Sequence, residues 1–312
     1  MFSVGCCKYP YFTTYLVCGV PHGSVLGPVL FVLYTVDLVS LIESHSLSPH
    51  LYADDTQVYG SCSPAAVDAL SVTISECSAD VASWMRSNRL QLNSDKTEVM
   101  WCTTDRRQHQ LPTAALPIDG VPVDPVSSVR DLGIYIDADL VMRTHVKKTA
   151  SRCFAVLRQL RQIRRYVSTD TFQALVVALV VTRLDYGNAV LTGLPVYLSR
   201  RLQSVLNAAA RLIFGLRRSD HVSDALISLH WLRIPQRIQF KMAVLTYKVL
   251  HGCAPSYLGP CVRVADLPSR RALRSANISR LIQPQSNRPT VGDRAFPAAG
   301  PQVWNSLPPE VT

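Results

Sequence analysis

The spacing of apolar residues changes near residue 137, and this change most constrains the fold. Between residues 19 and 137, short runs rich in β-branched and aromatic residues alternate with helix-like stretches. Beyond residue 139, apolar residues recur every three or four positions, which is typical of amphipathic helices. Strands mixed with helices, then helices alone, predict an α+β fold followed by a helical bundle.

The first part should contain a small antiparallel sheet with helices on one face. Residues 28–42 and 67–84 are helix candidates. Residues 51–53 and 56–59 are β-like and flank Asp54-Asp55, which predicts a hairpin with an acidic turn. Residues 98–102 and 129–136 are predicted strands, separated by a proline-rich loop.

The second part should contain four helices. The first has an apolar seam formed by Val146, Ala150, Cys153, Leu157 and Leu160. Residues 170–184 are apolar nearly all round, so we expect them in the middle of the bundle. Residues 202–213 form a third helix that suits an end at Gly215, and Pro235 and Gly252 bound the fourth. From residue 253 onward Pro, Arg and Ser dominate, which predicts an irregular tail.

The composition favours a packed protein with a polyanionic partner. A hydrophobic share of 48% and a charged share of 17% allow a sizeable core and argue against wholesale disorder. The net charge of +10 suits nucleic acid, because each neutralised phosphate releases counterions. A basic surface without such a partner is the alternative.

Cysteine usage and apolar runs bear on the compartment. The nine cysteines form no Cys-x-x-Cys pair, which favours reduced packing residues in an intracellular protein, cytoplasmic or nuclear. Lys8 and Pro10 interrupt the apolar N-terminal stretch, which argues against a signal peptide. Residues 174–181, taken as the longest apolar run elsewhere, are far shorter than the ~20 residues of a membrane span. We therefore expect no membrane segment.

The sharpest chemical feature is the adjacent pair Asp54-Asp55. Two neighbouring carboxylates at a tight turn repel each other unless a cation or water lies between them. Phosphoryl transfer through two metal ions needs such hard oxygen ligands, because Mg²⁺ prefers oxygen and keeps substrate phosphates in its shell. A solvated turn is the alternative, since Asp is a favoured turn residue.

A glycine-rich segment precedes this pair. Residues 19–28 contain three glycines and two prolines and lead into an apolar helix. Such a backbone permits close approach, and a helix N-terminus favours anionic phosphate. A serine nucleophile at Ser24 with His22 is a poor fit, because the segment is not a G-x-S-x-G elbow.

Together these segments resemble a known family. GVPHGSVLGPVLFVLYTVDL (residues 19–38) and YADDTQVY (residues 52–59) resemble motifs B and C of reverse transcriptases from non-LTR (LINE-type) retrotransposons. LNSDKTEVMWC (residues 92–102) resembles motif D, and VRDLGIYID (residues 129–137) resembles motif E, the primer grip. The later helices and GDRAFPAAGPQVWNSLPPEV (residues 292–311) resemble the thumb and downstream region. The resemblance implies a partial palm at residues 19–138, a helical thumb at 139–252 and an irregular basic region at 253–312, with residues 1–18 unassigned.

The resemblance implies a metal site. Asp54 and Asp55 match the metal-binding aspartates of motif C and would hold Mg²⁺, with Mn²⁺ as an alternative. Lys96 matches the motif D lysine that protonates pyrophosphate; a solvated surface lysine is the other interpretation.

The resemblance also implies contacts with an RNA template and a DNA primer, paired as an RNA–DNA hybrid. Gly23 and Ser24 match the motif B backbone beneath the incoming nucleotide and template. His22 stands where the family usually has Gln, and imidazole has fewer donors and can titrate. Leu132 and Gly133 match the primer grip, with an ordinary buried strand as the alternative.

The chain also departs from the family's pattern. In the family, motif A lies upstream of motif B and supplies a third metal-binding aspartate, whereas the first acidic residue here is Asp37, already inside motif B. The fingers have no counterpart either. We therefore expect no polymerisation by this chain alone, and an incomplete sheet that exposes an edge strand or an apolar patch. A non-catalytic nucleic-acid-binding remnant is the competing interpretation.

A basic stripe is expected on the first helix of the second part. At ~100° per residue, Lys147, Arg158 and Arg165 fall within roughly 20° of one another, away from the apolar seam. With neighbouring Arg161, they are predicted to contact a nucleic-acid backbone. A solvated helix face is the alternative, although few acidic residues are interleaved to pair with these cations.

Overall fold

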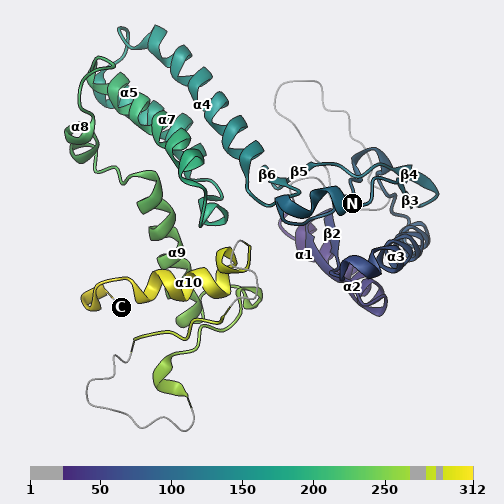
Figure 1. The fold of residues 1–312 in the computed structure, drawn as a ribbon. Helices are drawn as coiled ribbons and strands as arrows, with labels where there is room; N and C mark the ends of the chain where they lie inside the picture. The colour runs from purple at the N-terminus through teal and green to yellow at the C-terminus, as the bar shows by residue number, and fades with distance from the viewer. Residues whose placement is uncertain (1–23, 268–278, 286–290, 312) are drawn as a thin grey trace. The chain divides into compact units, whose positions relative to one another are not determined.

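The computed structural model describes residues 24–267, 279–285 and 291–311. The chain divides into two compact units (Figure 1). The first contains the described residues up to Val99 together with Gln110–Val126, and the second contains Met100–His109 and the described residues from Ser127 onward. Helices and small antiparallel sheets make up both units, so the α+β class is confirmed at that level.

Two short helices replace the single one predicted at residues 28–42. Helix α1 spans Gly27–Tyr34 and α2 spans Val36–Ser44. Between them the backbone of Thr35 leaves helical geometry (φ −103°, ψ 7°), and its hydroxyl donates to the carbonyl of Phe31 at 3.0 Å. Thr35 is buried, and this hydrogen bond pairs its hydroxyl group inside the protein. The break between the two helices therefore leaves no unpaired hydroxyl at this position.

Helix α2 packs as the helix of a globular core. Its residues Leu38 and Ile42 are buried against Cys77 and Val81 of α3, which spans Val67–Ser87 as predicted. Burial follows the three-and-four spacing on both helices, so apolar periodicity accounts for this contact.

Within the described part of the chain, Gly27–Ser44 is apolar and long enough to cross a membrane by length and composition. Its mean hydropathy is 1.5 over 18 residues, and the sequence-based expectation of no membrane segment did not take this stretch into account. In the second half of this stretch, helix α2 buries Leu38 and Ile42 against α3 in a globular core. Helix α1 has no buried residue and, with its neighbours, presents an exposed apolar patch. That patch consists of Val25, Leu26, Val29, Leu30, Val32, Leu33, Tyr34 and Val36.

Among the described residues the strands form three separate two-stranded antiparallel sheets instead of one sheet. Strand β1 (Ser48–Tyr52) pairs with β2 (Asp55–Tyr59). Strand β3 (Leu116–Ile118) pairs with β4 (Val121–Val123), inside the predicted proline-rich loop. Asp119 and Gly120 turn this hairpin with φ of 49° and 77°, as an Asp-Gly pair favours. Strand β5 (Ser128–Asp131) pairs with β6 (Ile134–Asp137).

Two strand predictions are wrong. Residues 98–102 form no strand, because their pairing is limited to an isolated bridge between Val99 and Pro125. Residues 129–136 form a hairpin instead of a single strand, because Leu132 and Gly133 adopt positive φ angles of 42° and 86° and reverse the chain.

The four long helices of the second unit are confirmed. Helix α4 spans Arg143–Ile163, and each residue of its predicted apolar seam is buried. Helix α5 (Thr169–Val176) continues through a π-helical turn (Val177–Val181) into α6 (Thr182–Asp185). Helix α7 spans Val196–Phe214 and ends at Gly215 with φ 67°, and α9 spans Ile234–Leu250. Helices α4, α5 and α7 lie side by side around the main core (Figure 1).

The remaining elements are short. Helix α8 (Ser223–Ser228) was not predicted. Turns of 3₁₀ helix occur at Pro64–Ala66, Ser94–Lys96, Asp105–Gln110, Asn188–Leu191, Ser256–Leu258, Val264–Asp266, Gly292–Arg294 and Pro309–Val311.

The predicted irregular tail is wrong for Phe296–Asn305, which forms helix α10 and packs along α9 (Figure 1). Pro297 lies in the first turn of α10, where a backbone N–H would have no partner within the helix. Proline lacks this N–H group, so it is compatible with a helix start. Gly300 allows the two helices to approach closely, because a Cβ there would lie 2.9 Å from the Thr246 Oγ1 atom. Arg294 anchors the segment by donating to the carbonyls of Thr192 and Leu140 at 3.0 and 2.7 Å.

Candidate metal site and nucleic-acid surface

The acidic pair lies at the tip of a hairpin, as predicted. Tyr52 pairs with Asp55, which leaves Ala53 and Asp54 as a two-residue turn. Ala53 adopts a φ of 52°, and positive φ at the first turn position suits the twist of a tight hairpin. Both Asp54 and Asp55 are exposed, so their carboxylates are open to solvent.

This turn offers oxygen ligands of the kind that a hard divalent cation prefers. Two adjacent carboxylates can bind one or two such ions, and the rest of each coordination shell then comes from water or a bound phosphate. In the part of the chain that the structure describes, no group of three or more His, Cys, Asp or Glu side chains is placed to hold a metal. The donor set of the hairpin is therefore the two aspartates.

The predicted motif B residues are only partly visible. Gly23 and His22 lie outside the described residues. Ser24 is half-buried, and its carbonyl accepts a hydrogen bond from the Gly27 amide at 3.3 Å, just before α1 begins. Pro28 occupies the first turn of that helix, as the sequence indicated.

Lys96 lies in the same unit as the acidic hairpin, at the end of the Ser94–Lys96 turn. Its side chain is exposed, and no ion pair joins it to Asp54 or Asp55. The position is compatible with either a surface lysine or a proton donor, so its predicted role stays a prediction.

Leu132 and Gly133 lie at a turn, so the alternative of an ordinary buried strand does not hold. Both are half-buried, and the Tyr186 hydroxyl donates to the Leu132 carbonyl at 2.5 Å. The ring of Tyr186 also lies 3.4 Å from the position that a Cβ on Gly133 would occupy. The second unit therefore holds this turn against the end of α6.

A cavity of about 450 Å³ lies beside this turn. It is lined by Gly133, His145, Thr149, Arg152, Arg183 and Tyr186. Sequence reasoning missed this site, because Arg183 and Tyr186 are distant in sequence from the turn that they approach. Neither residue belongs to any of the motifs in the sequence.

Three of the four predicted basic residues, Lys147, Arg158 and Arg161, lie on α4, whereas Arg165 lies in the turn after the helix ends at Ile163. Lys147, Arg158, Arg161 and Arg165 are all exposed, whereas the apolar seam of the same helix is buried. Among the described residues none of these four cations forms an ion pair with a carboxylate. Their charges are thus available to an external polyanion.

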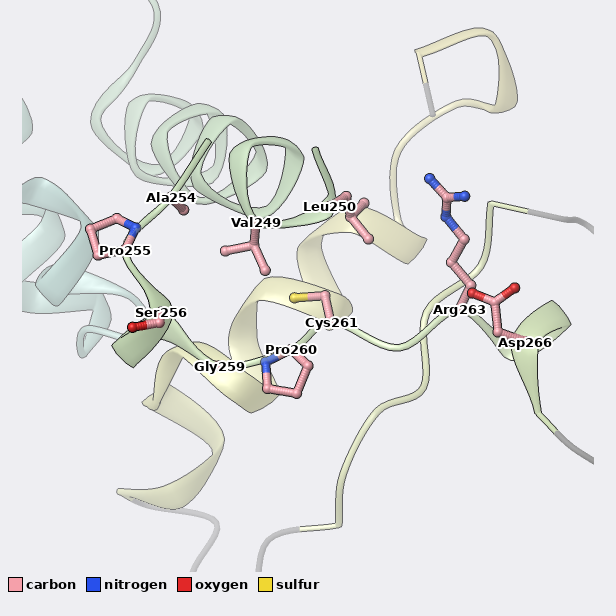
Figure 2. A pocket seen from close by; sticks show the side chains of 10 residues that line it. All are labelled: Val249, Leu250, Ala254, Pro255, Ser256, Gly259, Pro260, Cys261, Arg263 and Asp266. Atoms are coloured by element: carbon pink, nitrogen blue, oxygen red, sulfur yellow. The ribbon is translucent and has the colours of Figure 1, made fainter. Parts of the chain in front are cut away.

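A second cavity, of about 400 Å³, lies between the end of α9 and the segment after it (Figure 2). Val249, Leu250 and Cys261 give it an apolar part, and Arg263 and Asp266 lie at one end. Burial raises the pKa of the Cys261 thiol, which disfavours the nucleophilic thiolate.

Comparisons with known proteins agree with the motifs. Residues 6–136 match the model of the reverse transcriptase (RNA-dependent DNA polymerase) family. The chain is 34% identical over 164 residues to a probable RNA-directed DNA polymerase from transposon BS of Drosophila melanogaster, covering 50% of this chain and 17% of that protein. It is 30% identical over 206 residues to the corresponding protein from transposon X-element of the same species, covering 63% and 22%. No solved structure matches the chain.

The alignments thus span about a fifth of the length of these relatives. The family match includes the acidic hairpin and ends inside the β5–β6 hairpin. These matches and motifs B to E support a reverse transcriptase of the non-LTR retrotransposon type, to which residues 6–136 in particular are similar.

Proposed function

We propose that the chain supplies catalytic carboxylates and nucleic-acid-binding helices of an RNA-directed DNA polymerase and does not incorporate nucleotides by itself. One observation carries this proposal: within the residues that match the family, two exposed aspartates occupy the tip of a tight hairpin. Such carboxylates bind divalent cations, and the family generally uses divalent metal ions.

Asp54 and Asp55 would hold Mg²⁺, or Mn²⁺ in its place. When bound, the metal ions lower the pKa of the attacking primer hydroxyl and stabilise the charge on the leaving pyrophosphate. The hairpin fixes the two carboxylates on a short paired turn, which favours a defined ligand geometry. Lys96 acts as the proton donor to pyrophosphate, which its solvent-exposed ammonium allows.

The nucleic-acid partner is an RNA template paired with a DNA primer, inside the cell. The Leu132-Gly133 turn contacts the primer, and the motif B residues His22, Gly23 and Ser24 contact the template and the incoming nucleotide. The exposed stripe on α4 and the turn after it binds the duplex backbone through charge and not through base edges.

The chain alone is inactive because its metal site needs a further carboxylate. Asp37, the first acidic residue in the sequence, lies within α2 and near the end of motif B, so motif B is not preceded by an acidic residue in this sequence. The loss of one ligand from a two-metal site removes several kcal/mol of transition-state stabilisation.

A second candidate function is nucleic-acid binding without catalysis. The unpaired exposed cations of α4 favour it, because they need only a polyanion and no metal. The two proposals differ in whether Asp54 and Asp55 bind a metal ion.

The test is Mn²⁺ binding to the full chain, measured by electron paramagnetic resonance. We expect the wild type to bind Mn²⁺ and the double variant Asp54→Asn/Asp55→Asn to lose that site. Asp124→Asn is a matched control, because Asp124 is also an exposed carboxylate of the first unit. Equal binding by wild type and double variant would contradict the metal site and favour the non-catalytic function.

A further inference from the structure

Three cations surround one tyrosine on the β5–β6 hairpin. The Lys148 Nζ atom lies 3.8 Å from the ring centroid of Tyr135, and the guanidinium carbons of Arg152 and Arg130 lie at 5.8 and 6.0 Å. The Arg152 guanidinium also donates to the Tyr135 hydroxyl at 3.2 Å. Since Tyr135 is buried and the three cations are exposed, the ring acts as a platform that gathers positive charge at the surface.

The charge of this cluster also acts on the tyrosine. Desolvation opposes ionisation of the phenol, but the hydrogen bond from Arg152 and the charges of Arg152, Lys148 and Arg130 outweigh it and lower the pKa of Tyr135. A phenol that is shifted in this direction indicates a positive potential around the hairpin.

Two neighbouring carboxylates are already engaged. Asp137 is buried and accepts a hydrogen bond from the Thr144 amide at 3.0 Å, at the start of α4. Asp185 forms an ion pair with Arg237 at 2.5 Å. Asp131, on β5, is the remaining acidic residue of the hairpin. The cations near the turn therefore outnumber the acidic groups.

Arg152 connects the cluster to the 450 Å³ cavity beside the Leu132-Gly133 turn. Arg183 lines the same cavity from α6, just after the π-helical turn. A π turn adds one residue to a helical turn and rotates the next residues relative to an uninterrupted α-helix. Here Val180, Val181 and Leu184 stay buried while Arg183 is exposed beside the cavity.

His145 lines the cavity as a neutral group. The Tyr135 amide donates to its Nδ1 atom at 3.4 Å, so the ring carries its proton on Nε2. Burial lowers the pKa of His145, with an opposing contribution from Asp137 and a reinforcing one from Arg152. The cavity thus combines two arginines with a neutral imidazole and a threonine hydroxyl.

We propose that this cavity binds a backbone phosphate of a nucleic-acid strand, with Arg152 and Arg183 as its phosphate-binding residues. Guanidinium groups bind phosphate oxygens in a bidentate manner, and the volume is sufficient for a nucleotide-sized group. At ~100° per residue, Lys148 and Arg152 lie roughly 100° and 140° round α4 from Lys147, so this contact is separate from the stripe. The proposal rests on the proposed function, because it places the strand next to the motif E turn.

The test is binding of a fluorescein-labelled RNA–DNA hybrid to the full chain at several salt concentrations. In the variant Arg152→Gln/Arg183→Gln we expect about one unit less log–log salt slope and roughly eightfold weaker binding at ~0.1 M salt, as for one lost phosphate contact. The control Lys241→Gln/Lys248→Gln removes two exposed charges from α9 and should change the affinity less than twofold. Arg183→Gln alone should show part of the loss without a change in folding, because Arg183 is exposed.

Equal losses in the variant and the α9 control would mean that only total charge matters and would overturn the site. If replacing Lys147, Arg158 and Arg165 weakens binding while the Arg152 and Arg183 changes do not, the site fails and the proposed function stands. If the wild-type chain binds no hybrid at low salt, both proposals fail.

Discussion

Gly300 provides a quantitative test of how α10 packs on α9. A Cβ at this position would lie 2.9 Å from the Thr246 Oγ1 atom and 3.4 Å from two ring atoms of Phe296. Thr246 is fully buried and donates to the Met242 carbonyl at 2.9 Å, so it cannot move freely. Overpacking of this kind destabilises by about 1–3 kcal/mol. Replacing a helical Gly by Ala gains about 1 kcal/mol in propensity. Gly300→Ala should therefore destabilise by roughly 0–2 kcal/mol.

The two contributions separate in a double-mutant cycle. In a Thr246→Ala background the crowding atom is absent while the helix propensity gain remains, so Gly300→Ala should stabilise by up to about 1 kcal/mol. Hydrogen exchange of the α10 amides, followed by mass spectrometry, reports the local opening free energy, with about tenfold faster exchange per ~1.4 kcal/mol lost. An identical effect of Gly300→Ala in both backgrounds would refute the proposed close contact.

Two further predictions concern α4. Replacing Lys147, Arg158 and Arg165 by Ala should reduce the log–log salt slope of hybrid binding by up to about 3 units, and an unchanged slope would mark the stripe as a solvated face. Because burial lowers the pKa of His145 below its ordinary value of 6.5, the unfolded state binds the proton more readily, so stability should fall as the pH drops below that value. Denaturant titrations over this range should show the effect in wild type and its reduction in His145→Gln; an equal dependence in both would point to other groups.

The acidic hairpin and the α4 seam were predictable because local patterns determine them. β-like residues on both sides of Asp54-Asp55 favour a tight turn, and a helix buries whichever residues recur at three and four positions. The end of α7 at Gly215 follows from the same kind of local rule, since glycine accepts the left-handed conformation at a helix end.

The β5–β6 hairpin was not predicted because its first turn residue, before Gly133, is Leu132, and leucine is not a typical turn residue. A leucine at φ 42° is unusual, and apolar residues on either side suggested one continuous strand. In the structure the Tyr186 hydroxyl holds the Leu132 carbonyl, a contact between residues far apart in sequence. Local propensity does not contain that information.

The cavity beside this turn and helix α10 were missed for related reasons. A helix predicted from apolar periodicity is assumed to have 3.6 residues per turn. The π turn at Val177–Val181 breaks this periodicity and rotates the following residues, including Arg183, around the helix axis. In α10, Pro297, Gly300 and Pro301 together indicate irregular backbone, whereas packing on Thr246 of α9 favours a helix. Tertiary contacts override local propensity in both places.

The central claim is that Asp54 and Asp55 are reverse transcriptase carboxylates in a chain that needs a further ligand for catalysis. The most direct measurement is primer extension on a primed RNA template with Mg²⁺ or Mn²⁺, comparing the purified wild-type chain with Asp54→Asn. The account predicts no nucleotide incorporation by either protein, under conditions in which the wild type binds the hybrid. Incorporation by the wild type that disappears in Asp54→Asn would contradict it, because the described carboxylates would then suffice for catalysis.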